Sequence, residues 1–82
     1  MSGKQRAEDI RAQVRAVVAA QGQIDEDKLS DQADFLEDLH LDSIQMIEIL
    51  LDLEERFQIR ISDEEGDRLT CVQAICDYVA KH

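Results

Sequence analysis

A histidine and a serine in the middle of the chain are the first residues whose chemistry could define a function. His40 precedes Ser43 by three residues, and a hydrolase could use such a pair as base and nucleophile. Nucleophilic catalysis also needs a third orienting group, an oxyanion hole and a substrate pocket. A chain of 82 residues offers little room for these parts. We therefore expect no catalytic residue and an exposed His40 in a loop.

Two cysteines and many carboxylates are the other groups that could bind a metal ion. Cys71 and Cys76 are five residues apart on one predicted helix, which turns their side chains roughly 140° from each other. They therefore cannot share a metal ion or a disulfide bond, and Cys76 is expected in the core. The carboxylates do not follow the D-x-[DN]-x-[DN]-G spacing of a calcium-binding loop. We expect no metal site.

Composition limits the kind of partner. The chain carries 19 acidic and 9 basic residues, so its formal net charge is −10. A strongly negative protein repels phosphate backbones, and only 4% of the residues are aromatic rings on which bases could stack. We therefore expect no nucleic acid partner, and instead a partner with a basic protein surface.

Length and hydropathy predict one small domain, residues 1–82. The chain is 44% hydrophobic, which suffices for one core. No apolar run approaches the about 20 residues that a membrane span needs, and the N-terminus lacks the apolar segment of an export signal. Two cysteines without such a signal are typical of reduced thiols, so we expect a cytoplasmic location.

The acidity is concentrated in the middle of the chain. Residues 31–67 hold thirteen acidic side chains and two basic ones, whereas residues 1–20 and 68–82 are each net positive. This distribution is consistent with a solvated surface that keeps the protein soluble. The functional interpretation is a docking surface for a cationic partner.

The elements that would position Ser43 read as helices. A stripe of apolar residues at helical spacing predicts a first helix that ends near Gly22, and its members are Ile10, Val14, Val17 and Val18. Residues 21–42 have no steady period and are expected to form a long loop whose apolar side chains pack down on the helices.

The second helix is the clearest, from Ser43 to Phe57. Asp42 stands at its N-cap and Gln45 three residues later, which predicts a capping box. One apolar stripe is expected to face the core, formed by Met46, Leu50, Leu53 and Phe57. Further apolar residues exceed what the core needs and are expected to meet something outside it: Ile44, Ile47 and Leu51.

Two more capping boxes predict the remaining helices. Ser62 with Glu65 begins a brief helix that Gly66 interrupts, and Thr70 with Gln73 begins the last one. The inward residues of that last helix are expected to be Val72, Ile75, Cys76 and Val79. The fold class is therefore all-α, with three main helices, one short helix and a long loop between the first two helices.

Several strings around Ser43 carry a resemblance to a known family. They are Asp38-Leu39-His40-Leu41-Asp42-Ser43-Ile44, then Leu53 to Phe57, Ile61 to Glu65, and Thr70 to Tyr78. In this order and at these distances they resemble the D-S-aliphatic signature and the later L-E-E-x-F, I-x-D-E-E and T-V patterns of acyl carrier proteins. The resemblance covers nearly the whole chain.

The resemblance implies a four-helix bundle that has no catalytic activity of its own. It implies a covalent 4′-phosphopantetheine group on Ser43, beside Asp42 of the same motif, placed there by a phosphopantetheinyl transferase. The arm would carry acyl groups as thioesters between acyl-transferring and ketosynthase-type enzymes of fatty-acid, polyketide or related specialised biosynthesis. The protein is expected to be a monomer.

The same resemblance turns the acidic region into a docking face. Carboxylates along the second helix would steer the carrier toward basic patches on its partners, and these residues are Glu48, Asp52, Glu54 and Glu55. A small apolar contact beside the serine would come from Ile44, Met46 and Ile47.

Three residues depart from the family pattern. His40 stands where the family usually has Gly, Ile44 replaces the commonest Leu, and Arg56 stands where a third acid is frequent. These departures favour a specialised pathway about as much as housekeeping fatty-acid synthesis. The alternatives are a small acidic helical interaction module without a prosthetic group and a peptidyl or aminoacyl carrier.

Overall fold

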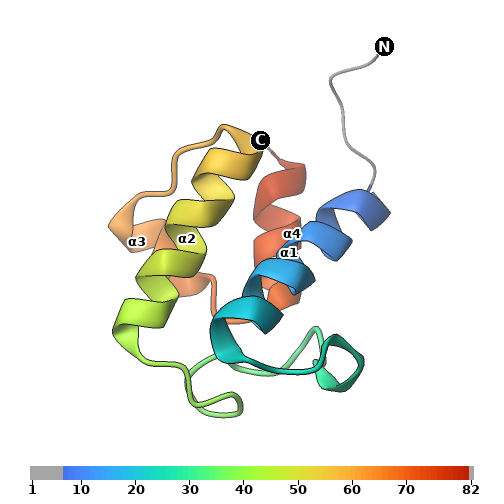
Figure 1. Ribbon diagram of the computed structural model, residues 1–82. Helices are drawn as coiled ribbons and strands as arrows, with labels where there is room; N and C mark the ends of the chain where they lie inside the picture. Colours follow the sequence, from blue (N-terminus) through green and yellow to red (C-terminus); the bar gives the residue numbers. More distant parts are fainter. Residues whose placement is uncertain (1–6, 82) are drawn as a thin grey trace.

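A computed structural model describes residues 7–81, and this part of the chain forms helices and loops without a strand. The elements are α1 (Ala7–Gly22), the short 3-10 helix η1 (Glu26–Lys28), α2 (Ser43–Phe57), α3 (Asp63–Arg68) and α4 (Val72–Ala80). Figure 1 shows their arrangement. The expected all-α class, the three main helices with one short one, and the long loop before the second helix are confirmed.

α1 lies at the centre of the bundle because it packs against both α2 and α4. Its apolar stripe is buried as expected, and Val14 and Val18 have no exposed surface. The four residues predicted to face inward from α4 are buried as well: Val72, Ile75, Cys76 and Val79. Burial raises the pKa of the Cys76 thiol above its ordinary 9.0, which suits a core residue and not a reactive one.

The buried face of α2 differs from the predicted stripe. Ile49 and Leu53 are fully buried, whereas Met46, Leu50 and Phe57 are only partly covered. Apolar residues surround most of this helix, so their spacing alone did not locate the centre of its buried face. Met46 and Leu50 pack at the edge of the core and line a groove that α2 shares with α3.

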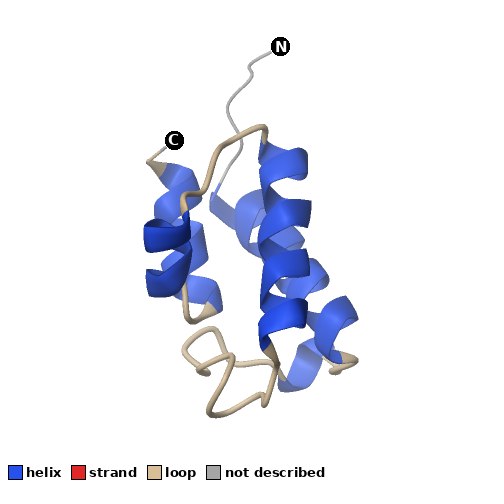
Figure 2. Cartoon of the chain, turned by 90° about the vertical axis from the view of Figure 1, so that its left-hand side faces the viewer, coloured by secondary structure: helices blue, strands red, loops and turns tan. Residues whose placement is uncertain are grey.

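The long loop crosses one end of the bundle, next to the first turn of α2 (Figures 1 and 2). Phe35 is its main anchor: the ring is fully buried, and its N–H donates to the Thr70 carbonyl at 2.8 Å. Leu29 and Leu41, which precede and follow Phe35 in the sequence, are buried as well. The loop therefore packs down on the helices as expected and delivers the chain to Ser43 in a fixed place.

Polar contacts fasten the same loop to α1 and α4. Asp31 accepts hydrogen bonds from Arg11 at 2.5 Å and Arg15 at 2.6 Å, and its carbonyl accepts from the Gln73 N–H at 3.0 Å. Arg15 also donates to the carbonyl of Leu29 at 2.7 Å. The two α1 arginines, part of the net positive first segment, are thus used inside the fold.

One predicted helix start is wrong. α4 begins at the N-cap residue Cys71, which makes no side-chain capping bond. The Thr70–Gln73 box does not form, because the Gln73 N–H bonds the loop carbonyl of Asp31 and its side chain bonds Arg11 and Asp77. Tertiary contacts have taken the groups that a local cap would have used.

Within residues 7–81, three residues other than glycine adopt left-handed backbone conformations, with φ of 53° at Gln23, 59° at His40 and 54° at Gln58. Gly22, expected to stop α1, is its last helical residue, and Gln23 makes the turn. Neither described glycine has a positive φ. Gly66 instead allows close packing of α3 on α2, since a Cβ there would lie 2.9 Å from Leu50 Cδ1.

Candidate functional site

Ser43 is the first residue of α2 and is exposed. The predicted capping box precedes it: the Gln45 N–H donates to Asp42 Oδ1 at 2.8 Å, and the Asp42 N–H donates to Gln45 Oε1 at 2.9 Å. The Asp42 carboxylate is thereby committed to starting the helix. This cap presents the serine hydroxyl to solvent at the positive end of the α2 dipole.

The start of α2 is also tied to the end of α1. Gln45 Nε2 donates to the Gln21 carbonyl at 2.9 Å, and the Leu41 N–H donates to the Phe35 carbonyl at 2.9 Å. Ser43 is therefore held by the bundle and not by a free loop. An exposed hydroxyl in a fixed position is suited to modification by another protein.

His40 does not act on Ser43. The histidine is exposed in the loop, as expected, and no hydrogen bond joins it to Ser43, both residues being in the described part of the chain. Its φ of 59° explains why glycine suits this position, because only glycine enters the left-handed region at no steric cost.

A groove of about 430 Å³ runs between α2 and α3 with Ser43 at its rim. Its lining is mainly apolar and includes Met46, Leu50 and Ile61, and α3 contributes Gly66. The complete lining is Leu36, Ser43, Met46, Ile47, Leu50, Leu51, Glu54, Ile61, Ser62, Asp63, Gly66, Asp67 and Thr70. The groove could accept a slender apolar chain that starts beside the serine.

Hydrogen bonds hold the α3 wall of this groove. Tyr78 on α4 donates to Glu65 Oε1 at 2.8 Å and lies 2.9 Å from the Arg60 carbonyl. The bond to Glu65 raises the pKa of Tyr78 above its ordinary 10.0. Glu65 also closes the predicted capping box with Ser62. These contacts fix the position of a helix that is only six residues long.

An exposed apolar stripe runs along the outer side of α2. The exposed fractions are 68% for Ile44, 55% for Ile47 and 59% for Leu51, so none of them serves the core. Met46, expected beside them, is half-buried and lines the groove. Leu36 in the long loop is 52% exposed and lines the groove too. No sequence pattern distinguished Leu36 as an exposed residue, because the apolar residues of the loop have no period.

The four predicted docking carboxylates are not equivalent. Glu48 accepts from Gln21 Nε2 at 3.0 Å, and Glu55 is exposed. Asp52 forms an ion pair with Arg56 at 2.9 Å. Glu54 turns to the other flank of α2 and accepts the Ile61 N–H at 2.7 Å, which closes the α2–α3 loop. Glu54 thus stabilises the groove wall.

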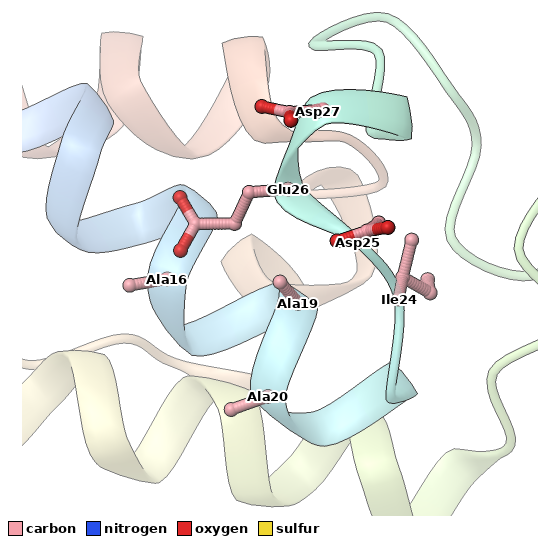
Figure 3. Close-up of a pocket in the computed structure, with 7 residues that line it drawn as sticks. All are labelled: Ala16, Ala19, Ala20, Ile24, Asp25, Glu26 and Asp27. Atoms are coloured by element: carbon pink, nitrogen blue, oxygen red, sulfur yellow. The ribbon is translucent and has the colours of Figure 1, made fainter.

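A second hollow lies between α1 and η1, lined by Ala16, Ala19, Ala20, Ile24, Asp25, Glu26 and Asp27. Figure 3 shows that its three carboxylates point in different directions. In residues 7–81 no group of three or more potential ligands could hold a metal ion. The same residues include no helix with the length and hydropathy of a membrane span.

Comparisons with known proteins agree on one family. A family model described as "Phosphopantetheine attachment site" matches residues 12–79. The curated acyl carrier protein of Rubrobacter xylanophilus is 36% identical over 75 residues, which cover 92% of this chain and 93% of that protein. A solved structure of the acyl carrier protein from Enterococcus faecalis superposes with a TM-score of 0.81 at 31% identity, covering 94% of this chain and 98% of that chain.

Proposed function

Because this chain belongs to the acyl carrier protein family, we propose that Ser43 carries a 4′-phosphopantetheine arm and that the arm holds acyl groups as thioesters. The observation that carries the proposal is the exposed Ser43 hydroxyl at the capped start of α2, beside an apolar groove. Among the described residues, one further serine, Ser62, borders that groove, and its hydroxyl is used to cap α3.

The residues around Ser43 fit this group. The positive end of the α2 dipole favours a phosphate bound at the helix start. The modification is a transfer from coenzyme A: the serine oxygen gives up its proton and forms a phosphodiester bond to the pantetheine phosphate, while the pyrophosphate bond of coenzyme A breaks and adenosine 3′,5′-bisphosphate leaves. A phosphopantetheinyl transferase is proposed to supply the base, since His40 makes no hydrogen bond to Ser43. When bound, the arm supplies a terminal thiol that forms thioesters.

The groove between α2 and α3 is proposed to shelter the beginning of a short acyl chain. Met46, Leu50 and Ile61 supply apolar lining, and burial of each CH₂ group stabilises the sheltered state by about 0.8 kcal/mol. Gly66 keeps the groove narrow at α3 because it permits close contact with Leu50.

The outer side of α2 is proposed as the docking face for partner enzymes. Exposed Ile44 and Ile47 offer an apolar contact near Ser43, and exposed carboxylates on the same helix attract basic surfaces. The partners in this proposal are the transferase and acyl-transferring and ketosynthase-type enzymes of fatty-acid, polyketide or related specialised biosynthesis. We also propose that the protein is a monomer and that it acts in the cytoplasm.

The test is a mass measurement on the purified chain. After incubation with coenzyme A, Mg²⁺ and a broad-specificity phosphopantetheinyl transferase, we expect the mass of one phosphopantetheine group to be added. Ser43→Ala should abolish the gain, whereas Ser30→Ala, at an exposed loop serine, should keep it. Circular dichroism establishes that each variant is helical.

Two results would reject the proposal. One is a folded native chain that gains no mass, which would favour an acidic helical interaction module without a prosthetic group. The other is a gain that survives Ser43→Ala. Loading of the modified chain with aminoacyl groups instead of acyl groups would favour the peptidyl-carrier alternative.

A further inference from the structure

Gly66 allows the end of the Leu50 side chain to fill part of the groove between α2 and α3. A Cβ on Gly66 would lie 2.9 Å from Leu50 Cδ1, well inside the about 3.5–4.0 Å at which carbon atoms pack. Gly66 is buried, and Leu50 is half-buried against the core. Leu50 therefore occupies space that any other side chain at position 66 would need.

This contact lies part of the way along the groove. Ser43 and Leu50 both line the groove and are seven residues apart on α2, about 10 Å along the helix axis. Met46 lines the stretch between them. The last α2 residue that lines the groove is Glu54, about 6 Å beyond Leu50. An apolar chain that enters at the Ser43 end thus reaches Leu50 before it reaches Glu54.

Polar contacts hold the α3 side of the groove in place. Tyr78 donates to Glu65 Oε1 at 2.8 Å, and Glu65 also closes the α3 capping box. At the far end, Glu54 accepts the Ile61 N–H at 2.7 Å, which ties the start of the α3 segment to α2. The end of the Leu50 side chain moves by rotation about single bonds. A chain deep in the groove would therefore displace Leu50 before it displaced α3.

From this geometry we propose that Leu50, packed on Gly66, limits the length of acyl chain that the groove shelters. CH₂ groups that lie before Leu50 are buried, and those that would lie beyond it stay in water. The two residues are thus specificity-determining for the cargo. They favour a short, straight acyl chain, because about 10 Å of groove precede Leu50. The inference rests on the proposed carrier function, since the acyl chain must be attached through Ser43.

The experiment loads Ser43 with a homologous series of straight acyl groups, odd as well as even. A broad-specificity phosphopantetheinyl transferase receives acyl-coenzyme A in place of coenzyme A. Urea unfolding followed by circular dichroism gives the folding equilibrium constant of each acylated chain, divided by that of the same variant with the unacylated arm. In the native chain each added CH₂ group should raise this ratio by up to about fourfold, until a limiting length beyond which the ratio stays constant.

Substitutions at the contact should move the limiting length in opposite directions. Leu50→Ala removes the outer carbon atoms of the side chain and should extend the limiting length by about three CH₂ groups. Leu50→Val disturbs the core less and should extend it by about one. Gly66→Ala pushes the end of Leu50 into the groove and should shorten the limiting length by about one CH₂ group. The double variant Leu50→Ala with Gly66→Ala should exceed the native limiting length, because the added methyl group then has no leucine to push.

Two matched controls make the same kinds of substitution outside the groove. Gly22→Ala crowds the end of α1, because a Cβ there would lie 2.8 Å from Ile24 Cδ1, but Gly22 does not line the groove. Ile44→Ala truncates an apolar side chain that is 68% exposed next to Ser43 and does not line the groove either. Both should leave the limiting length unchanged. Because each variant is compared with its own unacylated form, a general loss of stability cancels.

Three outcomes would overturn the inference. One is a ratio that does not rise with chain length in the native protein. Another is a limiting length that is the same in the native chain, Gly66→Ala and the Leu50 variants. The third is a limiting length that Gly22→Ala shortens as much as Gly66→Ala does. A native chain that gains no mass from the transferase would instead reject the carrier function, so the two failures are distinguishable.

Discussion

The left-handed backbone conformation of two non-glycine residues allows a prediction of how glycine substitutions change the free energy of unfolding. His40 and Gln58 have φ of 59° and 54°, in the region where a Cβ crowds the backbone at a cost of about 1–2 kcal/mol. Replacement by glycine removes this cost but adds about 0.5–1 kcal/mol of unfolded-state entropy that folding must overcome. We therefore expect His40→Gly and Gln58→Gly each to stabilise the fold by about 0.5–1 kcal/mol.

The assay is urea unfolding followed by circular dichroism, together with thermal unfolding. A gain of about 1 kcal/mol raises the Tm of a domain of this size by roughly 4–8 °C. His40 precedes the first turn of α2 and Gln58 follows its last turn, which separates them by more than about 20 Å. Their effects should therefore add in the double variant.

Gln32→Gly is the matched control. Gln32 is exposed in the long loop and does not have a positive φ, so glycine there brings only the entropic penalty and should destabilise the fold slightly. If Gln58→Gly were no more stable than the native chain, or if Gln32→Gly were stabilised equally, the argument from backbone strain would be refuted.

The remaining predictions concern the cap, the loop anchor and the groove wall. Asp42→Ala should cost about 1 kcal/mol through loss of the α2 capping box, and Asp42→Asn should cost less; thermal unfolding measures both. Asp31→Asn should cost about 2 kcal/mol in urea unfolding, because its bonds to two arginines fasten the long loop, while Asp27→Asn should change little. The bond to Glu65 raises the pKa of Tyr78 above 10.0, so its stabilisation is complete below pH 10 and is lost as the pH rises through the folded-state pKa. A comparison of unfolding free energies between pH 9 and 11 should therefore show a smaller decline in Tyr78→Phe than in the native chain, and an equal decline would contradict this.

Local signals predicted the start of the site well. The bounds of α2 and both partners of the Asp42–Gln45 capping box were predicted from neighbouring residues alone, and the structure has the same bounds and the same box. The Ser62–Glu65 box is confirmed for the same reason. In each case the side chain and the backbone group that it bonds are three residues apart, and the box forms although Gln45 also bonds Gln21 and Glu65 also bonds Tyr78.

Distant contacts account for what the sequence missed. The Thr70–Gln73 box failed because Gln73 bonds Asp31, far away along the chain. Ile49 was not recognised as a core residue of α2, because apolar neighbours occur around most of the helix and only packing on α1 selects a face. Exposed Leu36 has no local pattern that distinguishes it from buried Phe35.

On the proposed docking face, too, local features could be predicted from the sequence and distant contacts could not. The sequence places the carboxylates of α2 on one helix, but it does not say which are already engaged. The Asp52–Arg56 pair could be expected from its i,i+4 spacing. The turn of Glu54 toward the Ile61 N–H depends on the path of the α2–α3 loop, which only the folded structure fixes.

The bond from Gln45 to the Gln21 carbonyl has a consequence for when the chain can be modified during its synthesis. Gln45 belongs to the cap that starts α2, and Gln21 lies near the end of α1, so the local geometry at Ser43 is complete only after the two helices have met. A nascent or unfolded chain contains the same Asp-Ser sequence without this geometry. An enzyme that recognises the folded start of α2 would therefore modify only folded chains. Modification would then distinguish native copies from unfolded ones.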